Sequence, residues 1–159
     1  MKIRIIRSIY YNILKSRIGF YLFKFIFSSI KIVFHLLIRN KSDIIIFGAM
    51  NGIKYGDNAR RLFEYFLLKY DEIECCWMTN SLKVWKELRE KNLPVKLSWT
   101  FSGILTINKA KVGCYCNTLR DLSLDPLLTP DGLLLIALRH GKSVKGGAYS
   151  LKNYNDRYD

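Results

Sequence analysis

A histidine flanked by glycine and lysine residues is the part of this sequence best suited to chemistry. His140 precedes Gly141, Lys142 and Lys145, and it comes just after an apolar run over residues 133–138. An imidazole can accept a proton from an attacking hydroxyl, while ammonium groups and glycine amides can offset phosphate charge. The loop therefore predicts a phosphate-facing site. The alternative is an exposed turn whose lysines are merely solvated.

The glycine spacing does not fit two common nucleotide-binding loops. Gly48, Gly52 and Gly56 recur every four residues, unlike the GxGxxG pattern of dinucleotide sites. Residues 141–143 (Gly-Lys-Ser) resemble the end of a Walker A loop, but Ile136 stands where that loop requires its first glycine. We expect neither NAD binding nor a P-loop, and no cofactor.

The four cysteines do not suggest a metal centre. Cys75 and Cys76 are adjacent, Cys114 and Cys116 form a CxC, and each pair lies in an apolar stretch. Neighbouring strand residues point to opposite faces, so Cys75 and Cys76 could hardly share one metal ion. We expect buried, reduced thiols, no metal site and a reducing, cytoplasmic compartment.

Apolar runs alternate with amphipathic segments after residue 42. Asp57 and Asn58 offer N-cap oxygens to the first expected helix, and Ser81 opens the second. A weaker helix is expected over residues 101–108, followed after one strand by a long loop over residues 117–132 with one helical turn. The expected strands are residues 43–48, 73–78, 94–97, 112–116 and 133–138. Strands alternating with helices predict a doubly wound parallel sheet, a Rossmann-like α/β fold.

Residues 1–41 form a basic segment that differs from the rest of the chain. They contain nine lysines and arginines and no acid, whereas the remainder has 17 basic and 13 acidic residues, for a net charge of +13. Polar positions recur every three or four residues, as expected for one stripe of a helix opposite a wide apolar face. These positions are Arg17, Tyr21, Lys24, Ser28, Lys31 and His35.

This stripe predicts a helix that lies on an anionic membrane surface, with Arg17, Lys24 and Lys31 at the headgroups. The alternatives are packing on a partner domain or on the chain itself, and a membrane span. A span would place Lys24 and Lys31 in hydrocarbon, at about 2.5 to 3.5 kcal/mol each. The aromatic residues lie on the apolar face and do not interleave with the cations, so we expect no nucleic-acid partner. We therefore expect an anchor over residues 1–41 and one domain over residues 42–159.

Two segments together resemble a known enzyme family. Residues 55–65 (YGDNARRLFEY) and 139–145 (RHGKSVK) resemble motifs of the CDP-glycerol glycerophosphotransferases of teichoic acid and related polymer synthesis. In that family the first pattern opens the first helix, and a Trp-His-Gly-x-x-x-Lys loop closes the first half of the catalytic region. Trp77 and the expected strand near residue 112 add to the resemblance, which spans residues 43–149. Arg139 replaces the family's tryptophan.

The resemblance implies the N-terminal part of a GT-B enzyme at the cytoplasmic face of the bacterial membrane. Such an enzyme moves glycerol phosphate from CDP-glycerol to a hydroxyl on a lipid-linked acceptor, and CMP leaves. His140 becomes the general base. The residues that the resemblance assigns to substrate binding are Gly141, Lys142, Lys145, Asp57 and Asn58.

The family's second domain, which supplies most of the nucleotide site, has no counterpart before Asp159. We therefore expect a fragment, a truncated reading frame or one half of a split enzyme, with little or no turnover by itself. Two other functions stay open. One is a non-catalytic membrane-bound binding module, and the other is a GT-B glycosyltransferase that uses a nucleotide sugar.

Overall fold

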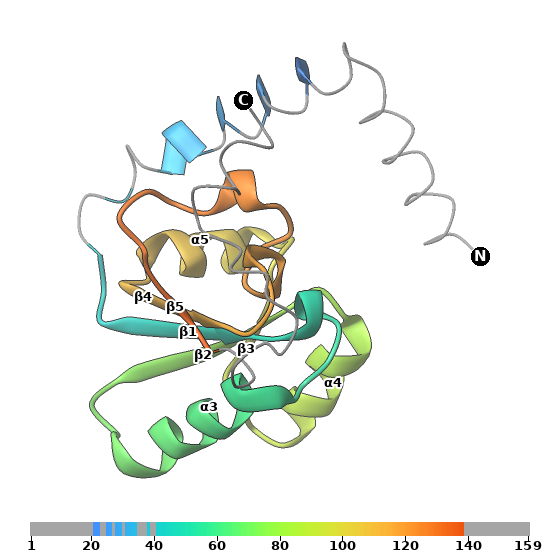
Figure 1. Cartoon of the computed structure of the whole chain (residues 1–159), viewed down its shortest axis with the longest axis vertical. Coiled ribbons are helices and arrows are strands. Elements are labelled where there is room, and N and C mark those ends of the chain that lie inside the picture. Colours follow the sequence, from blue (N-terminus) through green and yellow to red (C-terminus); the bar gives the residue numbers. More distant parts are fainter. Residues whose placement is uncertain are drawn as a thin grey trace, which may run out of the picture.

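The computed structural model describes residues 41–138 as one stretch, together with residues 21–22, 25–26, 28–29, 31–34 and 38. Its strands are β1 (Ile44–Gly48), β2 (Glu74–Thr79), β3 (Val95–Leu97), β4 (Val112–Tyr115) and β5 (Leu134–Ala137). They form one sheet in the order β3-β2-β1-β4-β5, and all neighbours are parallel (Figure 1). The predicted Rossmann-like parallel sheet is confirmed.

The central strand β1 is buried on both faces, which explains its uninterrupted apolar sequence. Ile46 and Phe47 are both fully buried although adjacent strand residues point to opposite faces. Ile46 pairs with Cys76 of β2 and with Gly113 of β4. A parallel strand that is covered on both faces reads as a continuous apolar run.

Helices cover the two faces of the sheet. α3 (Asp57–Lys69) and α4 (Leu82–Glu90) lie on one face, and α5 (Phe101–Lys109) lies on the other (Figure 1). Phe63 of α3 is fully buried in the core of the first face, and Ile107 of α5 is buried in the core of the second. All three helices lie where the sequence predicts them.

The connection from β4 to β5 contains two short 3₁₀ helices. They are η2 (Leu119–Asp121) and η3 (Pro126–Leu128), in the segment that the sequence predicts as a loop with one helical turn. Leu122, directly after η2, is fully buried in the core on the α5 face. The connection is therefore a packed part of the fold.

The start of α3 corrects one prediction. The N-cap is Gly56, which has extended backbone and no side chain, so neither Asp57 nor Asn58 is the N-cap. Asp57 instead lies in the left-handed region with a φ of 70°, and its Oδ1 accepts a hydrogen bond from the N–H of Asn58 at 2.8 Å. Asp57 is therefore the first residue of the helix, one position after the N-cap that we expected it to be. Its carboxylate still satisfies an amide of the first turn. At α4 the prediction holds, because Ser81 Oγ accepts from the N–H of Val84.

The described residues between 21 and 34 are helical, and the end of this helix contacts the domain. Phe34 is buried, and its ring centroid lies 5.6 Å from that of Phe101 in α5. Lys31 Nζ lies 2.7 Å from Asp131 Oδ1 in the turn before β5. Several large apolar side chains of the helix remain exposed, namely Leu22, Phe25, Ile26, Ile32 and Val33. Among the residues that the structure describes, no helix has the length and apolar character needed to cross a membrane.

Candidate functional site

Polar side chains gather at the edge where β1, β2 and β4 have their carboxyl ends. In a sheet of this strand order, β1 and β4 are the neighbours at which the connections change direction, and ligands of such folds bind beyond that point. Residues 49–56 follow β1 and residues 116–122 follow β4. These two loops form the described part of the candidate site.

Asp121 joins the two loops. Its side chain is fully buried, and its Oδ1 accepts a hydrogen bond from the N–H of Asn51 at 2.6 Å. Its Oδ2 accepts from the N–H groups of Cys116, Asn117 and Thr118 at 3.0, 2.7 and 3.4 Å. A carboxylate offers two acceptor oxygens, which here serve four converging backbone donors. The Asp121 carboxylate thus holds the loop after β1 against the loop after β4.

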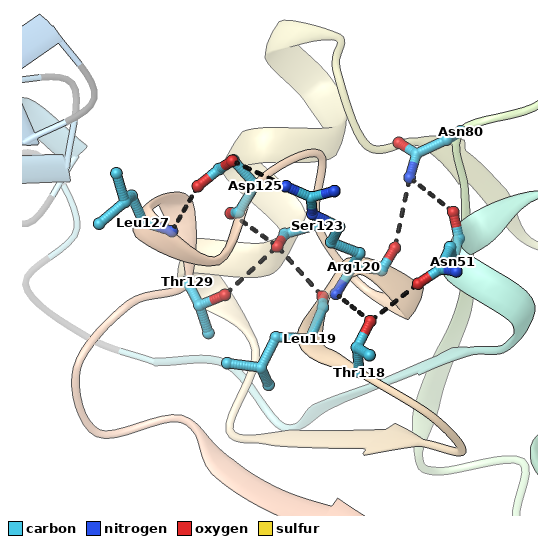
Figure 2. A network of polar contacts seen from close by, with 9 residues as sticks. All are labelled: Asn51, Asn80, Thr118, Leu119, Arg120, Ser123, Asp125, Leu127 and Thr129. Atoms are coloured by element: carbon cyan, nitrogen blue, oxygen red, sulfur yellow. Dashed lines mark hydrogen bonds and ion pairs between the residues drawn. The ribbon is translucent and has the colours of Figure 1, made fainter. Parts of the chain in front are cut away.

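Asn80, at the end of β2, extends this network. Its Nδ2 donates to the carbonyl oxygens of Asn51 and Arg120 at 3.1 and 3.3 Å, and Figure 2 shows both bonds as dashed lines. Its Oδ1 accepts from Ser98 Oγ at 2.9 Å. Thr118 Oγ1 donates to Asn51 Oδ1 at 2.9 Å. Residues that follow four strands are thus bonded to one another at this edge.

A second cluster holds the connection after η2 in place. Ser123 Oγ lies 2.8 Å from the carbonyl oxygen of Asp125 and 3.3 Å from Thr129 Oγ1 (Figure 2). Asp125 Oδ1 accepts from the N–H of Leu127 at 3.0 Å, and its Oδ2 lies 3.8 Å from Arg120 Nη2. The loop that borders the site is therefore ordered by its own side chains.

The backbone after β1 is strained at successive residues. Met50, Asn51 and Gly52 have φ values of 52°, 55° and 70°. A Cβ on Gly52 would lie 2.9 Å from the backbone nitrogen of Asn80, and its φ is positive, so the position requires glycine. A non-glycine residue in the left-handed region costs about 1 to 2 kcal/mol, which the bonds from Asp121 and Asn80 offset.

Within residues 55–65, one cluster joins Tyr55, Arg60 and Glu64. Tyr55 Oη donates to Glu64 Oε1 at 2.9 Å, and Arg60 Nε donates to the same oxygen at 2.8 Å. Burial raises the pKa of Tyr55 well above its ordinary value, and the bond to Glu64 adds to the rise. The hydrogen bond from Arg60 lowers the pKa of Glu64. The Tyr55 ring also packs edge-on against Trp77, with centroids 4.8 Å apart.

The four thiols are free and buried, as predicted. Cys75 faces the core on the α3 side and Cys76 the core on the α5 side. Burial raises the pKa of Cys75 and Cys114 to about 11 and that of Cys76 to about 12, so these thiols are protonated at neutral pH. They are therefore poor nucleophiles. Within residues 41–138 and the described helical residues, no three His, Cys, Asp or Glu side chains are grouped to hold a metal ion.

The structure describes only three of the predicted site residues. Asp57 and Asn58 lie at the start of α3, beside the loop after β1, and Lys31 is paired with Asp131. Leu138, two positions before His140, donates from its N–H to the carbonyl oxygen of Tyr115 at the end of β4, at 2.7 Å. The other predicted site residues lie outside the described part of the chain: His140, Gly141, Lys142, Lys145, Arg17 and Lys24.

Sequence reasoning missed Asp121, although a signal for it exists. Thr118 and Asp121 have the T-x-x-D spacing of a capping box, and the structure has both of its hydrogen bonds at η2. The same carboxylate also accepts from Asn51, 70 residues earlier, and no local pattern predicts that bond. The comparisons add no relative from which a role could be inferred: no family model, curated protein or solved structure matches the chain.

Proposed function

We propose that the chain is the acceptor-side half of a membrane-associated glycerophosphotransferase. Glycerol phosphate would pass from CDP-glycerol to a hydroxyl of a lipid-linked acceptor, in the synthesis of teichoic acid or a related surface polymer. The proposal rests on the resemblance of residues 55–65 and 139–145 to that family. One structural observation supports it most. Leu138, just before the second segment, packs against the same core as Tyr55 of the first.

This packing matters because Leu138, which precedes the second segment, lies at the same carboxyl edge of the sheet as Tyr55 of the first. Leu138 is hydrogen-bonded beside the end of β4, and the loop with Tyr55 follows β1. Since β1 and β4 are neighbours, Tyr55 and Leu138 both lie beside the crevice in which such folds bind ligands. Asp57 and Asn58 shape the entrance of α3 at that crevice and can contact the acceptor.

In the proposed reaction the acceptor oxygen attacks the phosphorus next to glycerol, and CMP leaves. His140 accepts the proton of the attacking hydroxyl. Lys142, Lys145 and the amide of Gly141 offset the charge that the phosphate oxygens carry in the transition state. The nucleotide end of CDP-glycerol is held mainly by the second domain of the family.

The N-terminal helix would hold this half enzyme at the cytoplasmic face of the membrane. Phe25 is 71% exposed, and Ile32 and Val33 are exposed as well, so the helix offers an apolar face to a lipid surface. Arg17 and Lys24 would lie at anionic headgroups. A peripheral position at that face brings the site to a lipid-linked acceptor and to a soluble nucleotide donor.

A substitution of the histidine tests the reaction. The full chain is combined with a C-terminal domain of the family, and CMP release from CDP-glycerol is measured with a lipid-linked acceptor. We expect His140→Ala to lower the rate at least 100-fold, the usual contribution of a general base. His35→Ala, which removes the other histidine, serves as the matched control. Release that is indifferent to His140 would exclude it as the base.

A non-catalytic membrane-bound module is the second candidate, and one observation favours it. In the described part of the site, Asp121 accepts from backbone N–H groups, and Asn80 bonds to Ser98 and to a backbone carbonyl. Thr118 Oγ1 bonds to the side chain of Asn51. Side chains that are satisfied in this way stabilise loops and leave little for a substrate. Binding of a lipid-linked polymer without CMP release would identify this function. Release of a nucleotide from a nucleotide sugar would instead identify a GT-B glycosyltransferase.

A further inference from the structure

The ammonium group of Lys41 has unusual surroundings. Its Nζ is shielded from solvent, and no described residue offers it a hydrogen-bond acceptor. Burial lowers the pKa of Lys41, and the negative charge of Asp131 only partly offsets this effect. A buried cation without a hydrogen-bonded partner is costly, so such a group points to an anion that completes its surroundings.

The carboxylate of Asp131, which attracts Lys41, is already ion-paired with another lysine. Asp131 Oδ1 lies 2.7 Å from Lys31 Nζ, at the junction of the N-terminal helix and the turn before β5. Lys41 Nζ reaches the same turn, since a Cβ on Gly132 would lie 4.0 Å from it. Figure 1 shows this junction on the side of the sheet that α5 covers. Asp131 is thus ion-paired with Lys31 and attracts Lys41 only through space, so the two lysines and one aspartate leave one positive charge over.

An apolar surface adjoins this charge. Ile32 and Val33 follow Lys31 in the helix and are exposed, while Lys31 turns toward the domain. A lipid whose acyl chains contact such a face presents its headgroup phosphate at the same depth as the flanking lysines. A phosphodiester carries one negative charge, which balances the net positive charge of Lys31, Lys41 and Asp131 together.

We propose that Lys41, together with Lys31 and Asp131, forms a binding site for the phosphodiester of an anionic lipid headgroup. The inference rests on the membrane attachment in the proposed function and adds a defined headgroup site to it. A soluble phosphate ester has the same chemistry, but the adjoining apolar helix face favours the lipid. Lys41 would then bind as a point charge, as lysines do at phosphates.

Two variants with the same net charge distinguish a defined headgroup site from diffuse electrostatic attraction to the membrane. Lys41→Gln removes the shielded ammonium, and Lys111→Gln removes an exposed one that is ion-paired with Asp43. Partition of the full chain is measured on phosphatidylcholine vesicles with and without 30 mol% phosphatidylglycerol, a composition of about one anionic lipid in three. We expect Lys41→Gln to weaken binding to the anionic vesicles about fivefold or more, and Lys111→Gln less than about twofold. Equal effects of the two variants would overturn the proposal.

Misfolding can be recognised independently. Because Lys41→Gln removes a buried charge that lacks a hydrogen bond, its urea midpoint should equal or exceed that of the wild type. Lys41→Arg keeps the charge and should retain most of the binding. A lowered urea midpoint for Lys41→Gln would show that Lys41 stabilises the fold without an anion, and it would overturn the proposal.

NMR of the wild-type protein with isotope-labelled lysine distinguishes a lipid phosphate from a soluble one. The Lys41 side-chain resonance should shift with phosphatidylglycerol vesicles and not with inorganic phosphate at equal phosphate concentration. A shift with inorganic phosphate alone would assign the site to a soluble ligand and overturn the lipid assignment. Vesicle binding that persists without any Lys41 shift refutes only this inference. Failure of the wild type to bind any vesicle refutes the membrane attachment itself.

Discussion

At the scale of single residues, Asp121 determines how two distant loops meet. Its two carboxylate oxygens accept hydrogen bonds from four backbone N–H groups, of Asn51 and of residues 116–118. Each of these donors lies at a chain turn where no strand or helix offers it a partner. Loss of the acceptor would leave one buried and three partly buried donors unsatisfied, which costs more than the net gain of an ordinary hydrogen bond.

Asp121→Asn should therefore lower the free energy of unfolding by about 2 to 3 kcal/mol. The amide retains one oxygen, but its NH₂ group must then face one set of backbone donors. Urea unfolding followed by circular dichroism at pH 7 measures the loss. Asp71→Asn is the control, because Asp71 is exposed in the turn between α3 and β2, and it should change stability by less than about 0.5 kcal/mol. Similar losses for both variants would contradict this role of Asp121.

Glu64 gives a prediction that depends on pH. The hydrogen bond from Arg60 lowers its pKa, so the ionised form contributes stability above the ordinary glutamate pKa, and this is lost as the pH falls through the lowered value. The contribution is at most about 0.5 to 1 kcal/mol, because Glu64 is 39% exposed and solvent screens the pair. Urea unfolding should show Glu64→Gln to be less stable than wild type at pH 7.

The same difference should shrink toward zero as the pH is lowered from 7 to an acidic pH below the lowered pKa of Glu64, where the wild-type carboxylate takes up its proton. Glu87→Gln is the matched control on α4, since Glu87 is also exposed and lies 3.9 Å from Lys83. We expect a smaller difference at both pH values for this longer ion pair. A deficit of Glu64→Gln that is equally large at both pH values would contradict the charge-dependent explanation.

At the scale of elements, the end of β1 and the 3₁₀ helix η2 are in unusually close contact. A Cβ on Gly48 would lie 2.0 Å from the carbonyl oxygen of Asp121, a distance that real Cβ atoms do not adopt. The absence of a side chain at Gly48 thus lets the connection after β4 cover the end of the central strand. It also brings the Asp121 carboxylate within reach of Asn51.

Gly48→Ala should separate these two elements and lower the free energy of unfolding by about 3 kcal/mol, as expected when added volume meets rigid backbone. Gly56→Ala is the matched control. No atom lies within 4 Å of a Cβ at Gly56, and its φ of −177° is open to any residue. Its cost should stay below about 1 kcal/mol, the usual range for alanine at an N-cap. Urea unfolding compares the two variants, and equal costs would refute the close contact.

The elements also show what the sequence could predict. All five parallel strands are apolar in sequence, including the mostly exposed β5, so the sequence located each of them, and the three helices followed from their apolar spacing. The exact start of α3 was missed because the left-handed backbone of Asp57 shifts the cap to Gly56. The bond from Asn51 to Asp121 was missed because it joins loops that only the folded sheet brings together. The role of His140 stays a prediction.

At the scale of the whole molecule, the described part of the N-terminal helix combines contact with the domain and exposed apolar side chains. The helix contacts the domain through Phe34 and Lys31, on the α5 side of the sheet. Leu22, Phe25 and Ile26 remain exposed. The α3 and α4 layer lies on the opposite face of the sheet (Figure 1). If the helix lies on a bilayer, that layer faces away from the lipid.

This arrangement predicts which apolar side chains contribute to membrane binding. Phe25→Ser and Ile32→Ser should each weaken partition of the full chain into anionic vesicles at least tenfold, since each loses about 1.5 to 3 kcal/mol of apolar burial. Leu68→Ser is the matched control, because Leu68 is 81% exposed but lies on α3, so we expect no change. Wild-type binding should also fall as salt rises, because the lysines contribute through screened attraction. An equal loss for Leu68→Ser would show that another face of the domain meets the lipid, and unchanged binding of all three variants would exclude the helix as the anchor.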